Sequence, residues 1–227
     1  MATWKHLALG AAALVLTPLA LVPCAATAAA APRMTVGADV AAPSGFREFC
    51  AREPDGCAGR EARSDAAPLV VEAGRKALLQ QVNREVNDLI APDDDARIYG
   101  VSEMWVNPLA DQARGARRQA RGDCEDYALA KRDRLIALGW APEALFLAVG
   151  YHQSYGLHAV LIARTDEGDM VLDSRTPWIE PWSQTAYVWV KRQLAADSAV
   201  WVRPYETAWS EAAAPDATTG ALPGRGR

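Results

Sequence analysis

The strongest candidate for chemistry in the sequence is a cysteine surrounded by acids. Residues 122–128 read Gly-Asp-Cys-Glu-Asp-Tyr-Ala, and a helical pattern continues to about residue 138. Asp123 is suited to cap that helix through its carboxylate, which places Cys124 beside unpaired backbone N–H groups and the positive end of the helix dipole. This position favours a thiolate, so we predict that Cys124 is a nucleophile. The same N–H groups could receive the oxyanion of a tetrahedral intermediate.

A cysteine nucleophile needs a base, and beyond His6 the sequence offers only His152 and His158. His158 lies inside a predicted strand, where packing can fix its ring, whereas His152 lies at a strand end. We therefore favour His158. Asp173 ends the next predicted strand and could orient the imidazole. If residues 165–168 form the hairpin loop between these strands, His158 and Asp173 lie on one face of the sheet as diagonal neighbours.

Each of these residues also has a purely structural explanation. A cysteine at the start of a helix is more often structural than catalytic. A histidine in a strand, or an acid at its end, is commonly a hydrogen-bonded structural residue. Composition alone does not decide between these explanations and a catalytic site.

The N-terminus has the features of a secretory signal peptide. Lys5 and His6 precede an apolar run to Val22, and small residues follow to Ala31. Cleavage at about residues 29–31 predicts a periplasmic or secreted protein. Lipidation of Cys24 is a weaker alternative, because the preceding residue is proline where a small residue is usual.

Export bears on the other cysteines, because extracytoplasmic compartments are oxidising. Cys50 and Cys57 flank a segment with proline and glycine that can turn back on itself. We predict that they form a disulfide, with two buried thiols as the alternative. Cys124 is then left unpaired, and catalysis is one reason for an exported protein to keep a free thiol.

Length and charge predict one domain with terminal extensions. The 227 residues carry a formal net charge of −4, which gives no electrostatic reason to expect a nucleic acid as partner. No later apolar stretch is long enough for stable membrane insertion after signal cleavage. The expected divisions are a signal peptide at 1–31, an extended lead-in containing the Cys50/Cys57 segment at 32–67, the catalytic domain at 68–207 and a disordered tail at 208–227.

Two helices followed by strands must position the candidate residues. Apolar spacings of three and four predict a helix over about 78–90, before Pro92. Residues 93–121 read as a loop with a short strand or turn, of the kind that often frames a site. The predicted strands cover residues 144–151, 157–164, 169–173, 187–191 and 200–205. The fold class is therefore α+β, with an antiparallel sheet.

Together these motifs resemble the bacterial transglutaminase-like cysteine proteinases. The resemblance is carried by residues 122–128, by Gly-x-His-Ala-Val at 156–160 and by Gly-Asp-x-Val-Leu-Asp at 168–173. It implies a papain-like α+β fold with the cysteine helix packed on an antiparallel sheet. It also implies a triad of Cys124, His158 and Asp173. Glu103 departs from the family pattern, which commonly has Asp before x-Trp.

The acids around Cys124 suggest a metal site. Asp123, Glu125 and Asp126 should raise the pKa of the thiol, and a divalent cation would neutralise them. Oxygen ligands suit Ca²⁺ better than zinc. The LapG-type proteases of this family are calcium-dependent through acids that match Asp123 and Glu125, with further ligands expected from water, backbone carbonyls or the loop 93–103. Acids that simply cap the helix are the alternative.

The predicted function is that of a periplasmic cysteine endopeptidase acting on a protein substrate. Through the LapG-type proteases, the resemblance makes a surface adhesin a candidate substrate and a membrane cyclic-di-GMP receptor a candidate partner. Two alternatives stay open. The same site could transfer an acyl group to an amine, or the protein could be catalytically idle and bind a peptide or receptor in its cleft.

Overall fold

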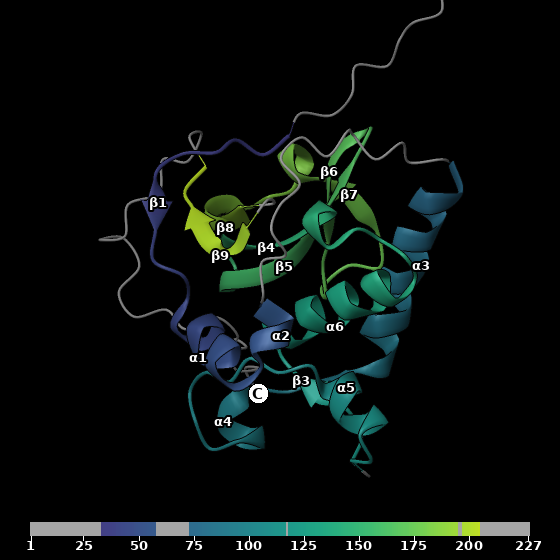
Figure 1. The fold of residues 1–227 in the computed structure, drawn as a ribbon, viewed down its shortest axis with the longest axis vertical. Coiled ribbons are helices and arrows are strands. Elements are labelled where there is room, and N and C mark those ends of the chain that lie inside the picture. Colours follow the sequence, from purple (N-terminus) through teal and green to yellow (C-terminus); the bar gives the residue numbers. More distant parts are fainter. Residues whose placement is uncertain (1–32, 58–72, 117, 195–196, 205–227) are drawn as a thin grey trace, which may run out of the picture.

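The protein is described by a computed structural model that covers residues 33–57, 73–116, 118–194 and 197–204 (Figure 1). The predicted signal peptide and the predicted tail at 208–227 lie outside these residues. Within the described ranges, none of the helices combines the length and the apolar character needed to cross a membrane.

A seven-stranded antiparallel sheet, in the order β1-β9-β8-β4-β5-β6-β7, forms the centre of the molecule. Its strands are β1 (Asp39–Val40), β4 (Leu145–His152), β5 (Gly156–Thr165), β6 (Gly168–Leu172), β7 (Ile179–Pro181), β8 (Val188–Leu194) and β9 (Asp197–Val202). The central strands read as nearly continuous apolar runs because both of their faces are buried. The five longer strands were predicted from sequence, and the antiparallel α+β fold class is confirmed.

Two long helices pack beside this sheet. Helix α3 (Ala73–Leu89) lies against α6 (Cys124–Ala137), and α6 packs on β5 (Figure 1). The apolar spacing that predicted α3 places Leu79, Val82 and Val86 in the core, each almost fully buried. The cysteine helix therefore packs on an antiparallel sheet, as the family resemblance implied.

Helical structure in residues 44–57 corrects the expectation of an extended chain only at 44–48, because the Cys50/Cys57 segment that follows was already set apart from the extended lead-in. These residues form α1 (Ser44–Arg52) and α2 (Pro54–Cys57), and the predicted disulfide between Cys50 and Cys57 joins the two helices with a Cα–Cα distance of 5.3 Å. Phe46 and Phe49 are buried in the main core. Their spacing of three residues brings both rings to one side of a helix.

The segment before Cys124 contains several short elements. These are β2 (Ala91–Pro92), α4 (Asp95–Ile98), α5 (Pro108–Ala113) and β3 (Arg121–Gly122), with β2 and β3 paired in parallel. The carboxylate of Asp94 caps α4, accepting the Arg97 N–H at 3.0 Å. Strand β3 leads directly into α6, so this segment borders the cysteine. Two short 3₁₀ helices, η1 (Pro142–Ala144) and η2 (Trp182–Gln184), complete the described elements.

Candidate active site

The hairpin of β5 and β6 brings His158 and Asp173 together. Arg164 pairs with Asp169, which is the register that the predicted loop requires, so His158 and Asp173 are diagonal neighbours on one face. The His158 Nε2 lies 2.8 Å from the Asp173 Oδ1, and both side chains are buried. Burial alone would raise the pKa of Asp173, but hydrogen bonds from His158 and Tyr187 and the charge of His158 lower it to about 2. Asp173 is therefore a carboxylate at neutral pH.

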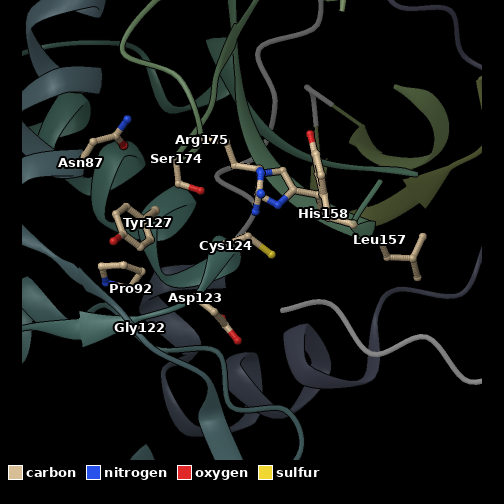
Figure 2. Close-up of a pocket in the computed structure, with 11 residues that line it drawn as sticks. Asn87, Pro92, Gly122, Asp123, Cys124, Tyr127, Leu157, His158, Ser174 and Arg175 are labelled. Atoms are coloured by element: carbon tan, nitrogen blue, oxygen red, sulfur yellow. The ribbon is translucent and has the colours of Figure 1, made fainter. Parts of the chain in front are cut away.

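Cys124 lies at the first turn of α6, next to the start of β5. Its Sγ accepts the backbone N–H of Ala159 at 3.3 Å, so adjacent residues of one strand contact the thiol and supply the imidazole. Cys124 and His158 both line a cavity of about 310 Å³ (Figure 2). The other residues that line it are Asn87, Pro92, Gly122, Asp123, Tyr127, Tyr155, Leu157, Ser174 and Arg175.

The surroundings of Cys124 favour its neutral form. Burial raises the pKa of the thiol well above its usual value, and the negative charges of Glu125 and Asp123 raise it further. The Glu125 Oε2 lies 3.0 Å from Sγ. Asp123 is the N-cap residue of α6, but the prediction that its carboxylate caps the helix is wrong, because it makes no capping hydrogen bond. Its carboxylate belongs instead to a group of buried acids.

Asp95, Asp123 and Glu125 form this group, with one carboxylate oxygen from each lying within 4.8 Å of the others. All three residues are buried, and each has an oxygen without a hydrogen-bond partner among the described residues. Burial, with the charges of neighbouring acids, raises the pKa of Asp95 to about 6 and that of Asp123 to about 7. Three buried carboxylates with unused oxygens have the chemistry of a site for a hard divalent cation.

Asp126 lies outside this group of three, although the sequence predicted it as a metal ligand. Its Oδ1 accepts the backbone N–H of Val106 at 2.9 Å and so holds the loop that carries Trp105. Asp95 was not singled out from sequence, although it lies in the loop from which further ligands were expected. Glu103, at the position where the family commonly has Asp, accepts the indole N–H of Trp105 at 2.7 Å.

A family model of the bacterial transglutaminase-like cysteine proteinases matches residues 36–208, which is more than half of the chain. The chain belongs to this family. As a member of the bacterial transglutaminase-like cysteine proteinases it is a cysteine peptidase, as the sequence predicted, and a protein substrate follows from that class. A comparison with curated proteins gave no match.

Solved structures of LapG from Legionella pneumophila are similar to this proteinase. The calcium-bound LapG structure is 25% identical, with a TM-score of 0.46, and the match covers 60% of this chain and 74% of that chain. A second LapG structure has a TM-score of 0.45 at 25% identity, covering 56% and 68%. The EGTA-treated LapG structure also has a TM-score of 0.45 at 25% identity, covering 56% and 66%.

Three side chains near Asp173 of this proteinase were given no role from sequence, namely Tyr187, Tyr155 and Asn87. The Tyr187 hydroxyl donates to the Asp173 Oδ2 at 2.5 Å, and the Tyr155 hydroxyl donates to the Tyr187 oxygen at 2.7 Å. The Asn87 Nδ2 donates to the Asp173 carbonyl oxygen at 3.0 Å. The sequence signal that could have indicated Asn87 is its spacing of one helical turn from Asn83, which places both amides on one face of α3. His152 stacks on Tyr155 with ring centroids 4.0 Å apart and does not line the cavity.

Proposed function

We propose that this proteinase is a periplasmic endopeptidase whose catalytic triad is Cys124, His158 and Asp173. One observation carries the proposal: a buried hydrogen bond joins His158 to an ionised Asp173 at a cavity that Cys124 also lines. The signal-peptide pattern before residue 32 supports the periplasmic location. The proposed divisions are a signal peptide at 1–31, a lead-in with the Cys50/Cys57 segment at 32–67, a catalytic domain at 68–207 and a tail at 208–227.

In the proposed reaction, Nε2 of His158 stays bonded to Asp173, which leaves Nδ1 to take the proton from the Cys124 thiol. The thiolate attacks the carbonyl carbon of the scissile peptide bond, and the negative charge moves to its oxygen. Backbone N–H groups at the first turn of α6 are the candidate donors to this oxyanion. His158 then gives its proton to the leaving amine, and a thioester remains on Cys124.

Hydrolysis of the thioester completes the cycle. His158 takes a proton from water as the water attacks the thioester carbonyl, and it returns a proton to the Cys124 sulfur as the acid product leaves. Asp173 keeps the imidazole in one orientation and stabilises its protonated form in both halves of the reaction.

We also propose that Asp95, Asp123 and Glu125 hold Ca²⁺. The residues fit this ion, because each offers a buried carboxylate oxygen with no hydrogen-bond partner within the described part of the chain. When bound, the cation would neutralise the acids beside Cys124 and thereby favour its thiolate. Asp126, which the sequence also suggested as a ligand, lies outside the group of three carboxylates whose oxygens come within 4.8 Å of one another.

A surface adhesin as substrate and a membrane cyclic-di-GMP receptor as partner remain proposals that rest on the family resemblance. A direct test of the reaction needs neither. Purified protein would be incubated with calcium and a proteome-derived peptide mixture, and mass spectrometry would identify the new termini. We expect free carboxyl and amino termini that are absent with Cys124→Ala.

The same experiment separates the alternatives. Carboxyl termini joined to an added primary amine, in place of free carboxylates, would indicate acyl transfer. No new product, together with an iodoacetamide alkylation rate of Cys124 no faster than that of an ordinary thiol, would indicate an idle binding protein and overturn the proposal.

A further inference from the structure

We propose that Tyr187 is a positioning residue of the catalytic triad, which fixes the Asp173 carboxylate through its hydroxyl and supports the His158 ring through its own ring. This inference rests on the proposed triad. Tyr187 lies immediately before β8 and is half-buried. It does not line the catalytic cavity, so its expected action is through Asp173 and His158 rather than on the substrate.

The hydrogen bonds around Asp173 give Tyr187 a specific task. The Asp173 Oδ1 faces His158 and also accepts the backbone N–H of Arg175 at 2.9 Å. The other oxygen, Oδ2, accepts the Tyr187 hydroxyl at 2.5 Å. The carboxylate is thereby held at both oxygens and cannot rotate without breaking a charge-assisted hydrogen bond. Without the hydroxyl, the buried Oδ2 loses this donor.

The direction of the Tyr187 hydroxyl is also set. Its oxygen accepts the Tyr155 hydroxyl at 2.7 Å, which leaves its own proton for Asp173. Burial and the charge of Asp173 raise the pKa of Tyr187 above its usual value, so the group stays protonated throughout the range in which the enzyme would work. Tyr155, Tyr187, Asp173 and His158 therefore form one hydrogen-bonded network, in which the donors converge on the Asp173 carboxylate from both sides.

The ring of Tyr187 lies against the proposed base. The rings of Tyr187 and His158 are nearly parallel, at 8°, with centroids 5.8 Å apart, and Tyr155 meets the His158 ring edge-on at 5.5 Å. These contacts limit tilting of the imidazole away from Asp173, which bears directly on the accuracy of proton transfer.

Gly150 provides the space for this arrangement. It lies on β4 between His158 on β5 and Trp189 on β8. A Cβ atom at residue 150 would come within 2.8 Å of the Tyr187 Cβ, whereas the backbone of Gly150 is not in the left-handed region. Residue 150 is therefore a glycine because the Tyr187 side chain leaves no room for a Cβ atom, and not because its backbone needs a left-handed conformation.

The principal test is Tyr187→Phe, assayed on a peptide that the wild type cleaves. We expect kcat to fall by ~10- to 100-fold, the range for loss of a hydrogen bond to a charged group, with a much smaller change in KM. The groups near Asp173 that carry charge or titrate are His158, Arg175, Lys131, Tyr155, Glu180 and Tyr187. In the proposed reaction His158 must be neutral to take the thiol proton, and a less firmly held Asp173 stabilises the imidazolium less, so the acidic limb of the kcat/KM profile should move to lower pH.

Two further variants separate positioning from general stability. Thr165→Val is the matched control, because it removes another buried hydroxyl hydrogen bond, the one to the Gly168 carbonyl at 2.8 Å, at a residue that does not line the catalytic cavity. We expect its pH profile to match the wild type. Gly150→Ala keeps every triad atom but displaces the Tyr187 ring. It should shift the acidic limb in the same direction as Tyr187→Phe.

The possible outcomes are distinct. A Tyr187→Phe enzyme with the wild-type kcat and pH profile would overturn the inference and leave the triad standing. Activity lost only in proportion to the unfolded fraction, measured by thermal denaturation, with an unchanged pH profile, would overturn the inference in the same way. A wild type that cleaves no peptide and whose Cys124 alkylates no faster than it does in His158→Ala would overturn the proposed function itself.

Discussion

His158 and Asp173 lie on neighbouring segments of one hairpin, and 2.8 Å separates their side-chain atoms Nε2 and Oδ1. Asp173 follows the last residue of β6, where its carboxylate also receives the Arg175 N–H and the Tyr187 hydroxyl. The Asp173 carboxylate is thus held by His158, which precedes it in the chain, and by Arg175 and Tyr187, which follow it.

The first prediction concerns the triad. Cys124→Ala and His158→Ala should each lower kcat/KM by ~10⁴-fold or more, because the nucleophile and the base act as one unit. Asp173→Asn should retain measurable activity, since the residue that orients the base contributes less in comparable triads. Circular dichroism should show intact folds. A folded His158→Ala enzyme with full activity would exclude this assignment.

The second prediction concerns calcium. Titration calorimetry on chelator-treated protein should detect Ca²⁺ binding that is strongly weakened in the Asp95→Asn, Asp123→Asn double variant. Asp126→Asn is the matched control, because an amide oxygen can still accept the Val106 N–H and binding should persist. Saturation to about 100 times Kd should stabilise the wild type by ~2.7 kcal/mol. Binding lost in Asp126→Asn but kept in the double variant would show that the ligands are misassigned.

The third prediction concerns the disulfide between Cys50 and Cys57. The Cys50→Ser, Cys57→Ser variant should lose at most ~3 kcal/mol of unfolding free energy, because the closed loop is short. Urea denaturation of both proteins measures the difference. Mass spectrometry of unreduced, alkylated protein should find Cys124 as the free thiol of the three. Alkylation of Cys50 and Cys57 without prior reduction would contradict the prediction.

The fourth prediction concerns Lys131, whose Nζ is buried in α6 with no hydrogen-bond partner in the described structure. Burial lowers the pKa of this lysine from 10.5 to about 7. Below about pH 7 the buried amine is protonated, and the whole free-energy cost of burying its charge lowers the stability of the fold. This cost falls as the pH rises toward 10.5, where the unfolded chain also releases the proton.

Lys131→Met should therefore raise the thermal midpoint at pH 6, by an amount corresponding to at most about 5 kcal/mol. The gain should shrink between about pH 7 and 10. Lys76→Met is the control, because Lys76 is exposed and its ion pair with Glu167 is exposed too, so little change is expected. A destabilised Lys131→Met protein at pH 6 would mean that the amine has a partner that compensates its burial.

The parts of the site that follow local rules were predictable from sequence. Strand alternation and an even loop predicted that His158 and Asp173 share a face, and apolar spacing predicted α3. Asp95 could not be found in this way, because α4 has only four residues and too short a periodic pattern to place its side chains. Tyr187, immediately before β8, reaches the site across Gly150 of β4, a contact that no local pattern encodes.

The place of β5 in the sheet has a consequence for local unfolding. One strand, β6, lies between β5 and the edge strand β7, which has only three residues, whereas Asp173 follows β6 itself. Edge strands open more readily than central ones, so amide hydrogen exchange should be slower in β5 than in β7. The histidine and the Ala159 amide that binds Cys124 are carried by β5, the more protected of these two strands. Transient opening near β7 would release the acid from the imidazole first, while the thiol and the imidazole stay in place.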